Sequence, residues 1–247
     1  MRLEFSQTPV NNQRIQQEQR KKLVKTYELI EDIFKNNHED NYDILIPELS
    51  EIFLEENFEL DEEIIKKGLE FTIQNHLGQY RDSGLPYAVH PVQTATTLTM
   101  WGRPQNEVIS GLGHDVVEDN EGKKDQLYEQ ILLLFGEDVR RNIETVTTHE
   151  QDREIRDKKH KARLIKTVEA TGNIAPLFIF CADKLNNLYS GKDMRSKNGF
   201  TAKERQKIYA EGIIKKVMPI AKYLDKQDLT EFKIASGMNY FARKLIN

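Results

Sequence analysis

The stretch GLGHDVVEDN, residues 111–120, places a histidine beside an aspartate, with two more carboxylates one helical turn later. On a helix, Glu118 would follow His114 by four residues and Asp119 would follow Asp115 by four, so all four side chains would share one broad face. Carboxylates at that density repel one another unless a positive group lies among them, and a divalent cation meets that need. The stretch therefore predicts a metal site with further ligands elsewhere in the chain.

Two other segments offer the missing ligands. His90 begins a new helix after a glycine-containing loop, in YAVHPVQTA, where the proline that follows it suits a first helical turn. Asp183 follows the apolar run LFIFCA, which would carry it into the core, where an unpaired carboxylate is costly. Two imidazoles and two carboxylates suit manganese, iron, zinc or magnesium with positions left open for water.

A bound ion of this kind lowers the pKa of its water and supplies a nucleophile at neutral pH. Glu118 and Asp119 are then the candidates for orienting that water or moving its proton. The sequence offers no Ser-His or Cys-His arrangement that competes with the metal site for the chemistry.

The remaining histidines and the single cysteine have simpler interpretations. We expect His76, His149 and His160 to pack or to cap helices, as an isolated histidine usually does. Cys181 lies inside the run LFIFCA, so we expect a buried, unreactive thiol in a reducing compartment.

The composition excludes several classes of partner. The 247 residues are 31% charged, with a net charge of -4, which gives no general attraction to nucleic acid or to anionic lipid. The N-terminus lacks the apolar core of a signal peptide, and no apolar run approaches membrane-spanning length. We expect a cytoplasmic protein that binds neither nucleic acid nor membrane.

Helical spacing dominates the chain, and no strict alternation of apolar and polar residues extends beyond a few positions. This pattern predicts an all-α helical bundle, with residues 1–58 as an N-terminal helical appendage and 59–247 as the main domain. The appendage is a candidate dimerisation or regulatory arm, so a homo-oligomer remains open. The expected helices cover 14–36, 45–56, a segment from Asp61, 91–101, 105–118, 124–134, 137–148, 158–171, 176–190, 202–223 and the tail.

Four segments together resemble a known family. HLGQYRDSGLPYAVHP, GLGHDVVEDN, LFGEDVRRNIETVTT and CADKLNNLYS resemble, in that order, the hydrolase domain of RelA/SpoT-type alarmone enzymes, over roughly residues 62–225. No nucleotide-transferase domain follows, which is similar to the stand-alone small alarmone hydrolases. The resemblance implies an HD-type, manganese-dependent phosphohydrolase of the stringent response, which removes the 3′-pyrophosphate from guanosine tetra- or pentaphosphate.

The resemblance also implies roles for matching positions. The manganese ligands match His90, His114, Asp115 and Asp183, and the acidic pair beside the attacking water matches Glu118 and Asp119. The family's contacts to the nucleotide match Arg81, which would pack against guanine, and Asn187, Ser190, Arg205 and Tyr209.

Part of this assignment also follows from spacing alone. Asp183, Asn187 and Ser190 lie at i, i+4 and i+7, so one stripe of a helix would face one cavity. Arg205 and Tyr209 share a face too, although a solvated arginine over a core tyrosine explains them equally well. The basic stretch 153–166 could clamp phosphates with Lys158, Lys159, Lys161 or Arg163, but a solvated face is the favoured interpretation.

Three positions depart from the family pattern. Asp82 replaces a frequent lysine, Gly113 a bulky residue, and Asn186 a frequent histidine or tyrosine; none is expected to touch the metal ligands. Asp82 leaves the exact nucleotide open. The rival functions are another HD phosphohydrolase, such as a 5′-nucleotidase or an NADPH phosphatase, and a non-catalytic nucleotide sensor. Because a sensor needs no acidic pair, Glu118 and Asp119 favour an enzyme.

Overall fold

The computed structural model describes residues 9–38, 40–148 and 153–247, and the side chains of 9–11 and 153–161 are not described. The regular structure within these residues is helical, apart from two isolated β-bridges, which confirms the all-α prediction. The α-helices in the described residues are α1 (Pro9–Asn36), α2 (Tyr42–Glu56), α3 (Glu62–Asn75), α4 (Val89–Met100), α5 (Gln105–Gly113), α6 (Lys124–Phe135), α7 (Glu137–Val146), α8 (Arg153–Thr171), α9 (Ala175–Ser190), α10 (Ala202–Gln227) and α11 (Ile234–Ile246).

The helix starts follow local chemistry. The Asp61 carboxylate accepts bonds from the backbone N–H groups of Glu63 and Ile64 at 2.9 and 3.2 Å and so caps α3. Thr201 and Glu204 form a reciprocal capping box at the start of α10. These side chains satisfy backbone donors that have no partner inside the helix, which fixes where each helix begins.

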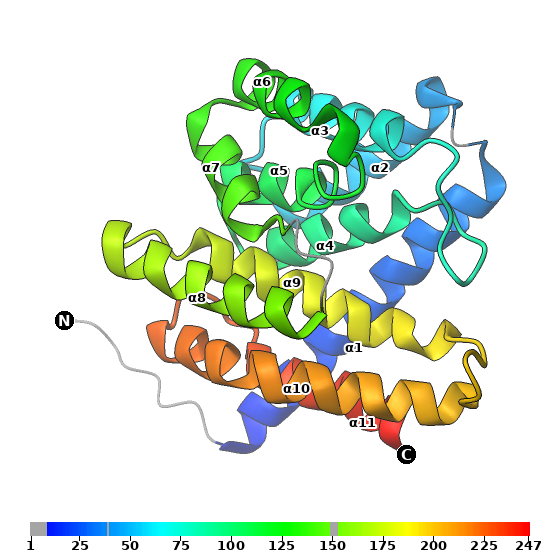
Figure 1. Ribbon diagram of the computed structural model, residues 1–247, viewed down its shortest axis with the longest axis vertical. Coiled ribbons are helices and arrows are strands. Elements are labelled where there is room, and N and C mark those ends of the chain that lie inside the picture. Colours follow the sequence, from blue (N-terminus) through cyan, green and yellow to red (C-terminus); the bar gives the residue numbers. More distant parts are fainter. Residues whose placement is uncertain (1–8, 39, 149–152) are drawn as a thin grey trace.

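Helix α9 forms the centre of the molecule. It contacts α4, α5 and α7 on one side and α10 and α11 on the other (Figure 1). Most of its residues are buried, including the polar Asp183 and Asn186. Polar groups on such a helix must find partners among the helices packed around it.

Helices α1 and α2 share the hydrophobic core with the rest of the chain. Leu23 and Tyr27 of α1 and Leu45 and Phe53 of α2 belong to the same cluster of buried side chains as the residues of α9. Helix α1 packs on α4 as well as on α2. The boundary at residue 58 stays a prediction about domain organisation.

The expected helix over 105–118 is wrong at its C-terminal end. Helix α5 stops at Gly113, and turns occupy residues 114–120. The Gly111 carbonyl, which would bond Asp115 in a continued helix, accepts from His114 Nδ1 at 2.8 Å. A side chain competing for a helical acceptor favours a turn. The acidic pair and the two predicted ligands before it, His114 and Asp115, therefore do not share one helical face.

No helix in the described part of the chain is both long enough and apolar enough to cross a bilayer.

Candidate metal centre

A tight loop between α3 and α4 presents Arg81 and leads into His90. The Arg81 N–H donates to the Leu85 carbonyl at 2.9 Å, and the Gly84 N–H donates to the Arg81 carbonyl at 2.9 Å. Gly84 has a φ of 90°, a conformation that side chains disfavour. Helix α4 then begins at Val89, so His90 lies in its first turn, as predicted.

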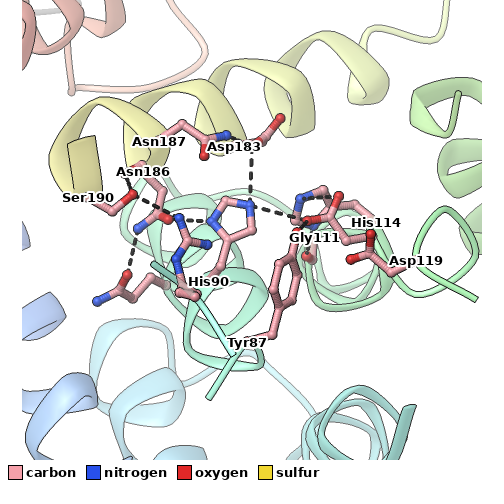
Figure 2. Close-up of polar contacts among 12 residues, drawn as sticks. Tyr87, His90, Gly111, His114, Asp119, Asp183, Asn186, Asn187 and Ser190 are labelled. Carbon is pink, nitrogen blue, oxygen red and sulfur yellow. Dashed lines mark hydrogen bonds and ion pairs between the residues drawn. The ribbon is translucent and has the colours of Figure 1, made fainter. Parts of the chain in front are cut away.

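Three of the four predicted ligands form one compact group. The ligand atoms of His90, His114 and Asp115 all lie within 4.8 Å of one another. His90 Nε2 lies 3.4 Å from Asp115 Oδ2 and 3.3 Å from Asp183 Oδ1, and His114 Nε2 lies 3.2 Å from Asp115 Oδ1 (Figure 2). Helices α4 and α9 and the turn after α5 thus bring His90, Asp183 and the His114–Asp115 pair together.

The hydrogen bonds of His114 show that the group fits a cation. Its Nδ1 faces the Gly111 carbonyl, which can only accept, so Nδ1 carries a proton and Nε2 is the nitrogen that a metal ion could bind. Among the described residues, that buried Nε2 has no hydrogen-bond partner. An Nε2 atom that faces a carboxylate attracts a positive group, either a proton on the nitrogen or a metal ion between the two atoms. The residues therefore suit a divalent metal site.

The local charges also favour a cation. Burial opposes a charge on His114, but the carboxylates of Asp115 and Asp183 outweigh it and raise the His114 pKa above its ordinary value. Burial lowers the pKa of His90, which keeps that imidazole neutral, as a metal ligand must be.

Asp183 differs from the other three predicted ligands because the ammonium group of Lys184 already pairs with it. Lys184 Nζ lies 2.6 Å from Asp183 Oδ2, and Asn187 donates to Asp183 Oδ1. Burial opposes the charge of this carboxylate, but Lys184 and His90 outweigh it and hold its pKa well below the usual range. Asp183 therefore remains ionised beside the histidines.

The two carboxylates of the acidic pair, Glu118 and Asp119, have different neighbours. Glu118 Oε2 accepts from the Thr148 N–H at 3.1 Å, which ties it to the segment after α7. Asp119 Oδ2 lies 4.0 Å from His76 Nδ1. Burial, with the nearby Asp115 and Glu118 carboxylates, raises the pKa of Asp119 to about 7. A carboxyl group with such a pKa can exchange a proton near neutral pH.

Two cavities adjoin the group. The larger, of about 470 Å³, is lined by the histidines, Asp115, Asp183, Glu118 and Lys184 and by Arg205. The smaller, of about 260 Å³, is lined by Arg81, Ser190 and the 80–83 loop segment. Asn187 and Tyr209 line both, so the two cavities lie side by side.

All five predicted substrate contacts lie around these cavities. Arg81 Nη2 donates to Ser190 Oγ at 3.0 Å, which joins the loop to the end of α9. The Arg81 guanidinium also lies over the Tyr87 ring, 5.7 Å from its centroid. Arg205 donates to the Arg195 carbonyl. The roles of these residues remain predictions.

Sequence reasoning missed several groups that touch the candidate ligands. The Tyr87 hydroxyl donates to Asp115 Oδ2 at 2.9 Å, and Asn186 Oδ1 contacts His90 Nδ1. The expectation that Asn186 would not touch the metal ligands is therefore wrong. No local spacing signals either contact, because Tyr87 lies in the turn before α4 and both partners are distant in the chain. Lys184 is simply the neighbour of Asp183.

The other departures and the histidines have structural explanations. A Cβ on Gly113 would lie 2.7 Å from Ile143 Cδ1, so α7 packs where a bulkier residue would stand. His76 is buried, its Nδ1 lies 2.8 Å from Gln79 Oε1, and its ring packs against Tyr87, as expected for a packing histidine. His149 and the side chain of His160 lie outside the described residues. Cys181 is fully buried, and burial raises its pKa, as expected for an unreactive thiol.

The basic stretch 153–166 is only partly described. The side chains of Lys158, Lys159 and Lys161 lie outside the described residues. Arg163 donates to the Thr147 carbonyl and is half-buried, so a solvated face is the wrong interpretation for this residue. It supports the segment after α7 that holds Glu118.

Comparisons with known proteins relate this chain to HD-domain proteins. The family model described as HD domain matches residues 68–211. A protein of Borreliella burgdorferi named guanosine-3′,5′-bis(diphosphate) 3′-pyrophosphohydrolase is 31% identical over 182 residues, which is 70% of this chain and 25% of that protein. Proteins of the same name are 29% identical in Spiroplasma citri, over 71% of this chain and 23% of the relative, and 32% identical in Aquifex aeolicus, over 66% and 24%.

The chain thus spans about a quarter of the length of these relatives. A solved structure of a metazoan ortholog of SpoT, described as hydrolysing ppGpp, superposes with a TM-score of 0.56 at 24% identity. The superposition covers 72% of this chain and 93% of the other, and it shows a shared fold.

Proposed function

Since this chain belongs to the HD-domain family, we propose that it is a metal-dependent phosphohydrolase that removes the 3′-pyrophosphate from guanosine tetra- and pentaphosphate. The observation that carries the proposal is the pair of imidazoles whose Nε2 atoms face carboxylates inside a cavity next to Arg81 and Ser190. The names of the relatives supply the substrate class.

His90, His114, Asp115 and Asp183 would hold the cation, and we propose manganese because two nitrogen and two oxygen donors suit it. When bound, the cation supplies a water of lowered pKa and neutralises charge on the phosphoryl group. The Tyr87 hydroxyl orients the Asp115 carboxylate toward the group. Lys184 adds a second positive charge at the wall of the larger cavity, where an anionic substrate would lie.

The acidic pair would manage the proton. Glu118 lines the larger cavity and is held by the Thr148 N–H, so it can orient the attacking water. Asp119, with a pKa of about 7, can accept a proton and release it to solvent. The structure gives the two carboxylates different surroundings, which supports a division of labour between them.

The smaller cavity would hold the nucleoside. The Arg81 guanidinium can stack on a purine or bond to it, and Asn187 and Ser190 lie between it and Asp183. Base and sugar held there would bring a phosphate attached to the ribose toward the metal group, in the larger cavity that Arg205 and Tyr209 also line. The 3′-pyrophosphate would then leave as one unit. A guanosine nucleotide substrate would place the protein in the cytoplasm.

Chromatography of the products tests this function. The manganese-loaded protein is incubated with guanosine tetraphosphate, NADPH and deoxynucleoside 5′-phosphates. We expect the protein to convert guanosine tetraphosphate to GDP and inorganic pyrophosphate and to leave NADPH and the deoxynucleoside 5′-phosphates unchanged. Release of single phosphates, or trimming of the 5′ end, would instead indicate a general HD nucleotidase or an NADPH phosphatase. Binding of the tetraphosphate without turnover would indicate a sensor.

A further inference from the structure

A chain of buried amides connects α1 to the imidazole of His90. Gln93 Nε2 donates to the Tyr27 carbonyl at 3.0 Å, and Asn186 Nδ2 donates to Gln93 Oε1 at 2.7 Å. Asn186 Oδ1 in turn faces His90 Nδ1. Gln93 and Asn186 are almost completely buried, with 2% and 0% exposure. We call Tyr27 carbonyl, Gln93, Asn186 and His90 the amide relay.

The direction of every bond in the amide relay is fixed from its α1 end. A backbone carbonyl can only accept, so the amide nitrogen of Gln93 must face Tyr27. The Glu31 carboxylate, 3.4 Å from the same nitrogen, reinforces this orientation. The oxygen of Gln93 therefore faces Asn186, which must present its own nitrogen there and its oxygen to His90. An oxygen opposite Nδ1 requires the imidazole proton on Nδ1.

We propose that Gln93 and Asn186 are positioning residues that hold His90 in its metal-binding tautomer, and that α1 sets their orientation through the Tyr27 carbonyl. With the proton on Nδ1, the Nε2 lone pair points at Asp115 and Asp183, where the cation would lie. With the proton on Nε2, the imidazole would bond to those carboxylates and could not bind the metal. The inference rests on the proposed metal site, and Tyr27 lies outside the matched family region 68–211.

Two variants interrupt the relay at different points. Gln93→Met keeps the length of the side chain but removes both amide functions, and Asn186→Leu removes the acceptor opposite Nδ1. Asn186→Asp is the rescue variant for the last bond alone: a carboxylate still accepts from Nδ1, although it no longer donates to Gln93. Thr97→Val is the control for general loss of contacts in the same α1–α4 interface: it deletes the buried bond between Thr97 and the Tyr27 hydroxyl but removes no amide group of the relay.

The first measurement is the tautomer of His90 in the metal-free, full-length protein, from the ring nitrogen shifts in ¹⁵N NMR. We expect the Nδ1–H tautomer in wild type, Thr97→Val and Asn186→Asp, and a population of Nε2–H in Gln93→Met and Asn186→Leu. The second measurement is manganese affinity by competition with a chelator. We expect affinity about 10- to 100-fold weaker in Gln93→Met and Asn186→Leu, with the double variant no weaker than the weaker single one.

The outcomes separate the relay from the proposed function. If wild type and Gln93→Met bind manganese equally and share one tautomer, the relay is refuted while the metal site stands. If Thr97→Val weakens binding as much as Gln93→Met, the effect is general destabilisation and the relay is again refuted. If wild type binds no manganese but its His90 tautomer still depends on Gln93, the relay stands and the proposed function fails.

Discussion

Replacing Asp119 with asparagine should stabilise the metal-free protein at neutral pH while it impairs turnover. Burial and the Asp115 and Glu118 carboxylates raise the pKa of Asp119 to about 7, compared with about 4 in an unfolded chain. A carboxyl group with a raised folded pKa favours the folded state fully below its unfolded pKa. That contribution is lost as the pH rises through the folded pKa. At about pH 8 the wild-type protein therefore holds an ionised carboxylate in an unfavourable position.

The magnitude follows from the shift and the exposure of the group. A shift of about three pKa units corresponds to about 4 kcal/mol. This is an upper limit, because 31% of the Asp119 side chain is exposed and water screens its charge. Halving it gives about 2 kcal/mol, or a rise in Tm of roughly 4–8 °C for a chain of this size. The advantage should vanish near pH 4, where the wild-type carboxyl is protonated.

Thermal unfolding followed by circular dichroism, after removal of metal by a chelator, measures this difference at several pH values. Asp125→Asn changes an exposed carboxylate on α6 and is the control, with little expected change in Tm. Saturating manganese should shrink the advantage of Asp119→Asn, because a nearby cation offsets the repulsion. If Asp119→Asn raised the Tm equally at pH 4 and pH 8, or lowered it at both, the reasoning would be refuted.

Four further outcomes are expected. His114→Ala and Asp183→Ala should each lose the metal and the activity, and full metal content in both by elemental analysis would contradict the ligand assignment. Glu118→Gln should lower kcat about 100-fold with near-normal metal content; loss of the metal would make Glu118 a ligand. Arg81→Ala should raise KM for guanosine tetraphosphate about 10-fold or more without changing manganese affinity, whereas an unchanged KM would mean that the base is not read. Lys184→Met should tighten manganese binding, since it frees Asp183 from its 2.6 Å ion pair, and should raise KM for the anionic substrate; isothermal titration and steady-state kinetics measure the two opposite effects.

The sequence predicted features that depend on local pattern. The helix of residues 175–190 follows from its apolar run, and that run carries Asp183 into the core because the other faces of α9 are covered by neighbouring helices. His90 lies in the first turn of α4 because the loop before it and Pro91 define a helix start. Local spacing and burial were therefore sufficient to predict that His90 and Asp183 lie on helices that meet in the core.

Local pattern was insufficient where a side chain competes with the backbone. The spacing of His114 and Glu118 fits a helix, but the His114 ring bonds to the Gly111 carbonyl and α5 ends. Residues 114–120 then follow turns, which direct Glu118 toward Thr148 and Asp119 toward His76. Periodicity predicted a helix at positions where the chain forms turns.

The buried amides were missed for a different reason. Asn186 contacts His90, 96 positions earlier in the chain, and no short-range pattern encodes that pairing. The sequence shows only a polar residue on an apolar helix. Which partner satisfies it depends on how α4 and α9 pack.

The amide relay also bears on when the metal site can form during folding. Tyr27 and Gln93 are 66 residues apart, and Gln93 and Asn186 are 93 apart. Contacts between such distant segments require the closure of long loops, so they form late in folding. During synthesis, both histidines leave the ribosome well before Asp183 and Asn186. A growing chain therefore carries two imidazoles without the carboxylate and the amide that complete their surroundings. A cation that bound only the finished site would stabilise only the finished fold. It would therefore select completed molecules rather than guide unfinished ones.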